Sequence, residues 1–164
     1  MSQCAGAKLQ RRFCAISEDI DCQCSAFTVL FYIMLLIKTK IAVSSIHGIG
    51  LFADEFVPKG TVTWQFNPII DVGFTDEEIA ALPEVARKTF LHYTYFDKDL
   101  QRHILCADDQ RFINHSTSGW NIESTPHKDI AARDIAVGEE LLCDYYKFDD
   151  TYFDQLNIKR ENLK

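Results

Sequence analysis

The chain has 164 residues, of which 47% are apolar and 25% are charged, a composition typical of a globular protein and not of a disordered chain. Its 24 acidic and 17 basic residues give a formal net charge of −7. This charge disfavours a general nucleic-acid coat, which needs a basic face to neutralise phosphates, so we expect no direct nucleic-acid partner. An acidic body would instead attract a protein partner with a basic, lysine-rich surface.

Residues 1–33 differ from the rest of the chain. They carry as many basic as acidic residues, and they contain four of the six cysteines: Cys4, Cys14, Cys22 and Cys24. Zinc binding by these thiols is one alternative, but their spacing lacks the paired C-x2-C segments of most zinc sites. We interpret residues 1–33 as a poorly ordered extension. One explanation is that they are translated from upstream of a true start at Met34.

An apolar run over residues 26–37 raises the question of a membrane or a secretion signal. Spanning a bilayer takes about 20 apolar residues, so the run is too short, and we expect no membrane partner. Its length suits a signal-peptide core, but three acidic residues lie just before it and no small-x-small cleavage site follows. We therefore expect a cytoplasmic protein, while a nuclear enzyme and a secreted effector stay open.

The first half of the remaining chain predicts two strands and then two helices. Alternating side chains predict a strand over residues 34–43, and β-branched and aromatic residues predict another over 61–66. Thr75 with Glu78 three residues later matches the capping box that starts a helix. Pro83 predicts the first residue of a second helix, one face of which would carry Leu82, Ala86, Phe90 and Tyr93.

The second half predicts short strands around a polar loop. The strands are expected over residues 102–107, 129–132 and 139–143. The loop over residues 108–126 is rich in Asn, Ser, Thr and Gly, and residues 145–153 are strongly aromatic. Many short strands with one helical insertion predict an α+β, mainly β fold. Residues 34–153 would form the domain, followed by a C-terminal tail over 154–164.

Common catalytic motifs are absent from the sequence. It contains no G-x-x-x-x-G-K-[ST] phosphate loop, no G-x-G-x-x-G, no H-E-x-x-H and no G-x-S-x-G. The histidines lack metal-ligand spacing, and we interpret His92, His103 and His127 as structural or exposed. His115 and Ser116 cannot form a nucleophile–base pair, because neighbouring side chains of an extended chain point to opposite sides.

Three blocks of sequence do carry a resemblance. Residues 47–53 read H-G-I-G-L-F-A and are followed by P-K-G at 58–60, residues 111–116 read R-F-I-N-H-S, and residues 132–145 read A-R-D-I-A-V-G-E-E-L-L-C-D-Y. In this order they resemble the motifs of the SET domain, the family of protein-lysine methyltransferases that use S-adenosylmethionine. The resemblance covers residues 34–153.

The resemblance implies a SET fold of short β-sheets with a helical insertion and a knot-like C-terminal crossing, which is rare among folds. In that crossing the segment 111–116 passes beneath the loop closed by Tyr145. The match is to compact SET proteins, because no cysteine follows Tyr145 to form a zinc segment after the domain. The early cysteines are also too few and wrongly spaced for the zinc cluster that precedes the domain in other members. We therefore expect no metal.

The resemblance also implies site residues. Tyr145 matches the closing tyrosine, which steers the lysine amine and polarises the methyl group, and is the expected catalytic residue. Asn114 and His115 match the pair that binds the cofactor. Ile49 and Gly50 would bring backbone close to the methionine part of the cofactor, where small residues are needed.

Arg111 has two open roles. It could bond the cofactor carboxylate, which makes it a further cofactor-binding candidate. It could equally hold its loop in place by pairing with a carboxylate such as Glu139 or Asp144.

Aromatic side chains are the candidates for a narrow channel that receives the lysine. Such a channel packs the aliphatic stem on rings while hydroxyls orient the nitrogen. The channel candidates are Phe66, Tyr93, Tyr95 and Phe148. At Phe66 many family members carry a tyrosine, so a hydroxyl near the channel would be lost here.

The leading functional hypothesis is methyl transfer from S-adenosylmethionine to the side-chain amine of lysine in a protein substrate with an accessible lysine. A histone-like basic protein would suit the acidic body. The alternative is a catalytically silent SET-fold module that binds lysine-containing peptides, motivated by Phe66 and by the altered segment after Ser116. The sequence leaves the substrate, the degree of methylation and the oligomeric state open.

Overall fold

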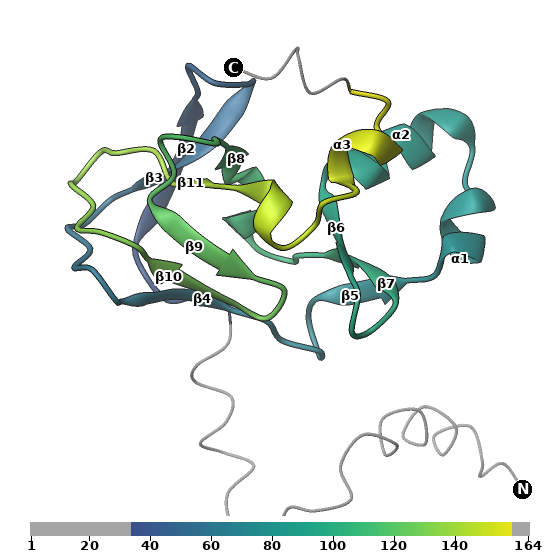
Figure 1. The fold of residues 1–164 in the computed structure, drawn as a ribbon, viewed down its shortest axis with the longest axis horizontal. Coiled ribbons are helices and arrows are strands. Elements are labelled where there is room, and N and C mark those ends of the chain that lie inside the picture. Colours follow the sequence, from purple (N-terminus) through teal and green to yellow (C-terminus); the bar gives the residue numbers. More distant parts are fainter. Residues whose placement is uncertain (1–33, 159–164) are drawn as a thin grey trace, which may run out of the picture. The chain divides into compact units, whose positions relative to one another are not determined.

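Three β-sheets form the frame of residues 34–158, the part of the chain that the computed structural model describes (Figure 1). The predicted extension over 1–33 and the last residues of the predicted tail, 159–164, lie outside the described residues. The largest sheet has the order β1 (Met34–Leu35), β4 (Val62–Gln65), β10 (Lys128–Ala131), β9 (Ile122–Thr125), β11 (Leu142–Cys143) and β8 (Asn114–His115). The α+β, mainly β fold predicted from the sequence is confirmed.

The other two sheets are small. An antiparallel hairpin joins β2 (Thr39–Val43) and β3 (Ile49–Ala53), and a three-stranded sheet has the order β5 (Val72–Phe74), β7 (Arg102–Leu105) and β6 (Thr94–Asp97). The single strand predicted over 34–43 is therefore two strands, β1 and β2, which pair with different partners. The hairpin turn reverses at Gly48, whose φ of +52° is a left-handed conformation that favours glycine.

The predicted helical insertion lies between β5 and β6. Helix α1 (Asp76–Ala80) begins at Thr75, whose hydroxyl accepts from the Glu78 N–H while the Glu78 carboxylate accepts from the Thr75 N–H, so the capping box is confirmed. Helix α2 (Glu84–His92) begins one residue later than predicted, because Pro83 is its N-cap residue.

The predicted face of α2 is only partly correct. Phe90 is partly buried, and its ring meets that of Phe74 at 4.7 Å. Ala86 is exposed, whereas Arg87 and Leu91 are partly buried. The helix thus lies on the surface with a shallow contact face, rotated from the one expected.

The predicted polar loop over 108–126 contains regular structure that local sequence does not reveal. It includes a 3-10 turn, η2 (Asp109–Phe112), and the strands β8 and β9. Strand β11, from later in the chain, lies between these two strands and is parallel to both, with Cys143 opposite His115 and Ile122. This insertion of β11 between β8 and β9 is the form that the expected C-terminal crossing takes.

The core has two parts that meet near the C-terminal segment. Leu51, Ile135 and Leu141 are fully buried in one cluster, and Trp64 and Ile104 are almost fully buried in the other. Each such side chain contributes about 1.5–3 kcal/mol when it leaves water. Leu35 and Phe148 pack against both clusters. The aromatic C-terminal segment therefore joins the two parts.

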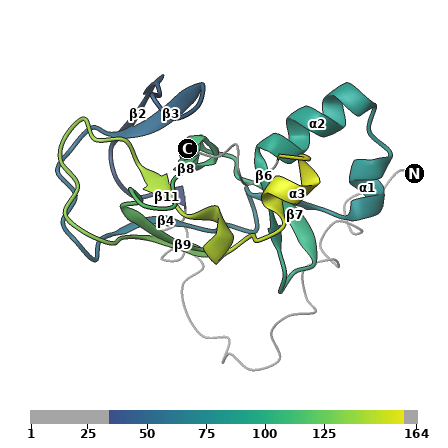
Figure 2. The same cartoon turned by 45° about the horizontal axis from the view of Figure 1, so that its top comes forward.

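The last two elements of the described residues are η3 (Tyr145–Lys147) and α3 (Tyr152–Gln155). Helix α3 lies beside α2 in both views (Figures 1 and 2), and the Tyr152 hydroxyl donates to the carbonyl of His92 over 2.7 Å. In residues 34–158, no helix is long and apolar enough to cross a bilayer.

Candidate functional site

A cleft of about 580 Å³ is the larger of two adjoining hollows. Its walls come from four parts of the chain: the turn over residues 46–49, His92 and Tyr93 at the end of α2, the segment 111–115, and C-terminal residues that include Tyr145 and Phe153. This volume lies within the usual range for small-molecule and cofactor sites, about 300–1,000 Å³.

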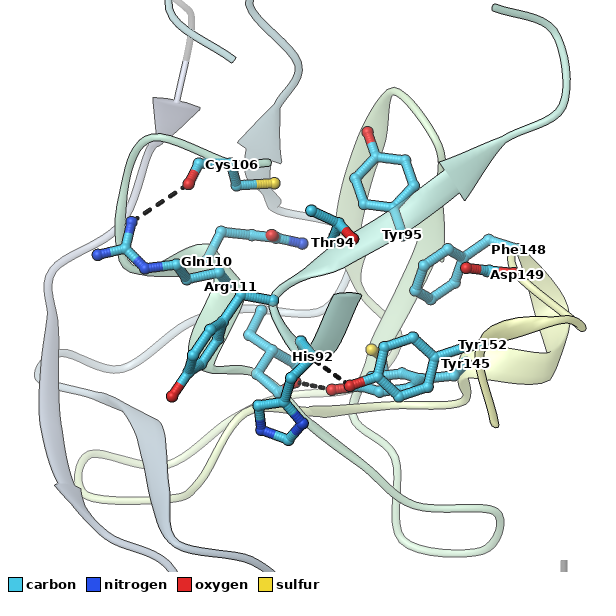
Figure 3. A pocket seen from close by; sticks show the side chains of 13 residues that line it. His92, Thr94, Tyr95, Cys106, Gln110, Arg111, Tyr145, Phe148, Asp149 and Tyr152 are labelled. Carbon is cyan, nitrogen blue, oxygen red and sulfur yellow. Dashed lines mark hydrogen bonds between the residues drawn. The ribbon is translucent and has the colours of Figure 1, made fainter. Parts of the chain in front are cut away.

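A second cavity of about 40 Å³ has a lining rich in aromatic side chains (Figure 3). Tyr95 and Phe148 contribute rings to its walls, and Asp149 contributes a carboxylate. The two hollows share five lining residues: His92, Tyr93, Arg111, Tyr145 and Tyr152. A cleft of cofactor size and a cavity of side-chain size therefore meet at a common wall, and Tyr145 is part of that wall.

Asn114 joins β8 to the hairpin turn. Its side-chain nitrogen lies 3.2 Å from the carbonyl of His47, 3.0 Å from that of Ile49 and 2.9 Å from Oε1 of Glu140. These hydrogen bonds fix the backbone at Ile49, which lines the cleft. Gly50 permits the close approach, because a Cβ there would collide with the Glu140 carboxylate and lie 3.2 Å from Nδ2 of Asn114.

Glu140 is a site residue that the sequence analysis did not single out. It belongs to the third block of the resemblance, and Gly50 belongs to the first. The sequence places these two residues in separate blocks and does not reveal that they are in contact. The role of Glu140 follows only from that contact.

His115 forms part of the cleft wall and is 8% exposed. Its Nδ1 accepts a hydrogen bond from the Tyr145 N–H over 3.1 Å, so the ring proton must sit on Nε2. Burial lowers the pKa of His115, and the nearby carboxylate of Asp144 acts in the opposite direction. The buried Nε2 has no hydrogen-bond partner in the part of the chain that the structure describes. The Nε2–H group of His115 can therefore donate a hydrogen bond to a ligand in the cleft.

Tyr145 is held at both ends. Its backbone donates to His115, and its hydroxyl donates to the carbonyl of Ile113 over 2.5 Å. Its ring meets that of Tyr152 edge-on at 4.8 Å. Burial raises the pKa of Tyr145 well above its usual range, so the hydroxyl stays neutral. The hydroxyl oxygen still has lone pairs that can accept a hydrogen bond.

Arg111 turns back onto its own segment. Its Nη1 donates to the carbonyls of Cys106, Ala107 and Asp108 at 3.0–3.2 Å, and its guanidinium lies 4.8 Å from the centre of the Phe112 ring. The suggested pairing with Glu139 or Asp144 is therefore wrong. The Glu139 carboxylate is taken by Arg133, at 2.5 Å. Arg111 nevertheless lines both hollows.

Three of the four channel candidates reach the small cavity. Tyr93, Tyr95 and Phe148 line it, and Tyr93 also lines the cleft. Phe66 lines neither hollow; it packs against the cluster that contains Tyr95, and its ring centre lies 5.4 Å from that of His127. The structure thus does not bring Phe66 to the channel, because its side chain is used in packing.

The histidines interpreted as structural or exposed fall into two groups. His103 and His127 each bond a carboxylate, that of Asp76 at 2.9 Å and that of Asp97 at 2.8 Å, away from the cleft. His92 instead lines both hollows, and its ring lies 5.5 Å from that of His47. Burial lowers the pKa of His92, and so does the neighbouring His47.

The remaining groups of the site limit its chemistry. Burial raises the pKa of the thiols of Cys106 and Cys143 well above the usual value, so neither supplies a thiolate nucleophile. Among the described residues, no group of three or more His, Cys, Asp and Glu side chains is placed to hold a metal ion. The arrangement is suited to binding, orienting and excluding water.

The family of this protein follows from its sequence as well as from this geometry. The SET domain model matches residues 48–146, more than half of the chain. The chain belongs to the SET domain family.

Solved structures resemble this one. The crystal structure of an active polycomb repressive complex 2 in the basal state has 25% sequence identity and a TM-score of 0.51, covering 66% of this chain and 15% of that chain. The Chaetomium thermophilum Polycomb Repressive Complex 2 bound to GSK126 has 22% identity and a TM-score of 0.56, covering 74% and 17%.

A third structure is ctPRC2 in an autoinhibited conformation bound to S-adenosylmethionine, with 22% identity and a TM-score of 0.52, covering 74% of this chain and 16% of that chain. The chain thus spans less than a fifth of the length of each of these three chains. The comparison with curated proteins gave no match.

Proposed function

We propose that this protein transfers methyl groups from S-adenosylmethionine to the side-chain amine of lysine in a protein. One observation carries the proposal: a cleft of cofactor size and an aromatic cavity of side-chain size share the wall that contains Tyr145. A methyl donor in the first and an amine in the second would meet there. Membership of the SET domain family supports the same class of reaction.

The cleft fits the cofactor. S-adenosylmethionine supplies a methyl group on a positively charged sulfonium. The backbone at Ile49 and Gly50, held by Asn114, would take the amino-acid end, and the unpartnered Nε2–H of His115 offers a donor to a buried acceptor. The ring of Phe153, 4.9 Å from that of His115, adds a flat apolar surface to the cleft.

The small cavity favours a neutral amine. A lysine with a pKa of about 10.4 is neutral in only about one part in 2,500 at pH 7. Burial against aromatic walls lowers that pKa, and the positive charge of Arg111, which lines the cavity, acts in the same direction, whereas the carboxylate of Asp149 in the same lining acts in the opposite direction. The hydroxyl oxygen of Tyr145 can then accept an N–H bond and orient the amine for in-line attack. The protein's task is positioning and desolvation.

A basic protein segment is the substrate class that suits this chain. The net charge of −7 attracts lysine-rich surfaces. The carboxylate of Asp149 lines the small cavity, so a cationic side chain meets negative charge as it enters. Core histones are accordingly the first substrates to test.

The test is transfer of labelled methyl groups from S-adenosylmethionine by the full chain, with core histones and a whole-cell protein extract as acceptors. Y145F removes the hydroxyl at the shared wall, and we expect it to lower the rate at least about 100-fold, as the loss of a preorganised polar group does in other enzymes. Y146F makes the same chemical change one residue away, on a side chain that lines neither hollow, and should keep the rate within about twofold.

Two results would contradict the proposal. Cofactor binding without transfer to any protein would favour the silent module that binds lysine-containing peptides. No cofactor binding by the folded chain would exclude methyl transfer from S-adenosylmethionine.

A further inference from the structure

We propose that the hydroxyl of Thr94 binds the target amine in the small cavity; this inference rests on the proposed function. Thr94 is 4% exposed and lines the cavity, and its Oγ1 has no hydrogen-bond partner among residues 34–158. A buried hydroxyl without a partner is costly, so such groups in native proteins call for an explanation. A ligand that supplies the missing partner is the simplest one.

Several other polar groups of this cavity already have hydrogen-bond partners. The hydroxyls of Tyr145 and Tyr152 donate to backbone carbonyls at 2.5 and 2.7 Å. Asp149 accepts from the backbone of Phe96 at one oxygen and from Thr151 at the other. Among the described side chains that line the cavity, Thr94 alone has a buried nitrogen or oxygen that lacks a partner in the described residues.

The position of Thr94 suits contact with an incoming amine. It is the first residue of β6 and follows the end of α2 directly. The close-up shows it between Gln110 and Arg111 on one side and Phe148 and Asp149 on the other (Figure 3). Thr94 is thus one of the residues that line the cavity.

The hydrogen-bonding groups of a lysine amine match the hydroxyl of Thr94. A neutral primary amine that aims its lone pair at a methyl donor has two N–H groups left to donate. The hydroxyl oxygen of Thr94 can accept one of them, and that of Tyr145 the other. The cavity volume of about 40 Å³ exceeds the roughly 10–15 Å³ that a single water needs, so the space admits the end of a lysine side chain.

This role predicts an unusual combination of effects for two matched variants of the full chain. T94V keeps the shape of the side chain and loses the hydroxyl, whereas T94S keeps the hydroxyl and loses a methyl group. Because the hydroxyl has no partner in the free protein, T94V should be at least as stable as wild type in urea unfolding. A structural role would instead make T94V clearly less stable, which would overturn the inference.

Methyl-transfer assays of the same two variants test the role of Thr94 in function. We expect T94V to lower kcat/KM for the protein substrate about five- to tenfold, the loss of one hydrogen bond, while T94S stays within about twofold. Affinity for S-adenosylhomocysteine should be equal in all three proteins, because Thr94 does not line the cleft. Equal kcat/KM in T94V and wild type would overturn the inference.

A separate measurement distinguishes failure of this inference from failure of the proposed function. If wild type transfers no methyl group, the proposed function fails. Binding of n-butylamine, which reproduces the end of a lysine side chain, is then followed by ligand-observed NMR with S-adenosylhomocysteine present. Tighter binding to wild type and T94S than to T94V supports the role of Thr94, and equal binding to all three overturns it.

Discussion

The backbone N–H of Tyr145 donates to Nδ1 of His115 over 3.1 Å, across 30 residues of sequence. The bond requires His115 to be neutral, because a protonated ring has no lone pair at Nδ1. His115 thus helps to position Tyr145 at the shared wall, and it does so only when its ring is neutral.

This requirement predicts a loss of stability in mild acid. The pKa values of His115 and His92 are lowered in the folded protein, so between that lowered value and the usual 6.5 or so the unfolded chain binds more protons. Their contribution to stability is complete above about pH 6.5 and is lost as pH falls below it. The slope approaches about 1.4 kcal/mol per pH unit for each group. Urea unfolding at pH 7.5, 6.5 and 5.5 measures it.

Asp129 acts with the opposite sign in the same pH range and provides the control. It is fully buried, and burial raises the pKa of its carboxyl to about 7, so the folded protein binds its proton first and gains stability as pH falls. D129N removes this gain. The loss of stability between pH 7.5 and 5.5 should therefore be steeper in D129N than in wild type; an equal or shallower loss would contradict the assignment of signs.

Asn114 and Glu140 should show coupled effects. N114D replaces the amide donor by a carboxylate next to that of Glu140, and we expect a loss of about 2 kcal/mol or more in stability together with weaker binding of S-adenosylhomocysteine. In the double variant N114D/E140Q, the donor is restored on the opposite side. Urea unfolding should show a partial recovery, since the bonds to His47 and Ile49 stay lost. A double variant weaker than N114D would show that the pair does not interact as described.

Gly50 should tolerate no side chain while Glu140 is present. We expect G50A to cost about 1–3 kcal/mol, because the added methyl group forces the Glu140 carboxylate away from Asn114. The cost should be smaller in an E140A background, which a double-mutant cycle on urea midpoints measures.

Gly48 provides the matched control. Its left-handed backbone makes G48A destabilising for a different reason, and a Cβ there meets nothing within 4 Å. We therefore expect no coupling between G48A and E140A. Equal coupling for both glycines would show that the effect is not steric.

The sequence could predict elements whose signal is local. The capping box at Thr75 and the strands β4 and β7 follow from neighbouring residues and agree with the structure. Strands β8 and β9 could not be predicted, because their short, polar segments become strands only by pairing with β11.

The same distinction holds for the site. Asn114, His115 and Tyr145 could be placed together by the resemblance; all three line the cleft, and His115 and Tyr145 are hydrogen-bonded. The role of Glu140 depends on contact across 26 residues with Asn114, and the orphan hydroxyl of Thr94 on what surrounds it in space. No pattern in one sequence reports either.

At Phe66 the sequence-based prediction and the structure disagree about whether the side chain lies in the lysine channel, and a substitution tests this directly. The aligned position suggested a lost hydroxyl near the channel, but the side chain lines neither hollow. We therefore expect F66Y to leave both the rate and the distribution of mono-, di- and trimethyllysine within about twofold of wild type, by mass spectrometry of the product. A clear shift toward a different methylation state would place Phe66 in the channel after all.

The insertion of β11 between β8 and β9 affects how the site forms during synthesis and folding. Both halves of the site exist in a nascent chain before residue 142 is made, yet the strand that joins them is synthesised last. Contacts between residues so far apart in sequence form slowly. A chain made only as far as β9 would therefore lack a working centre, and the site would become competent only once β11 has been made and has paired with both strands.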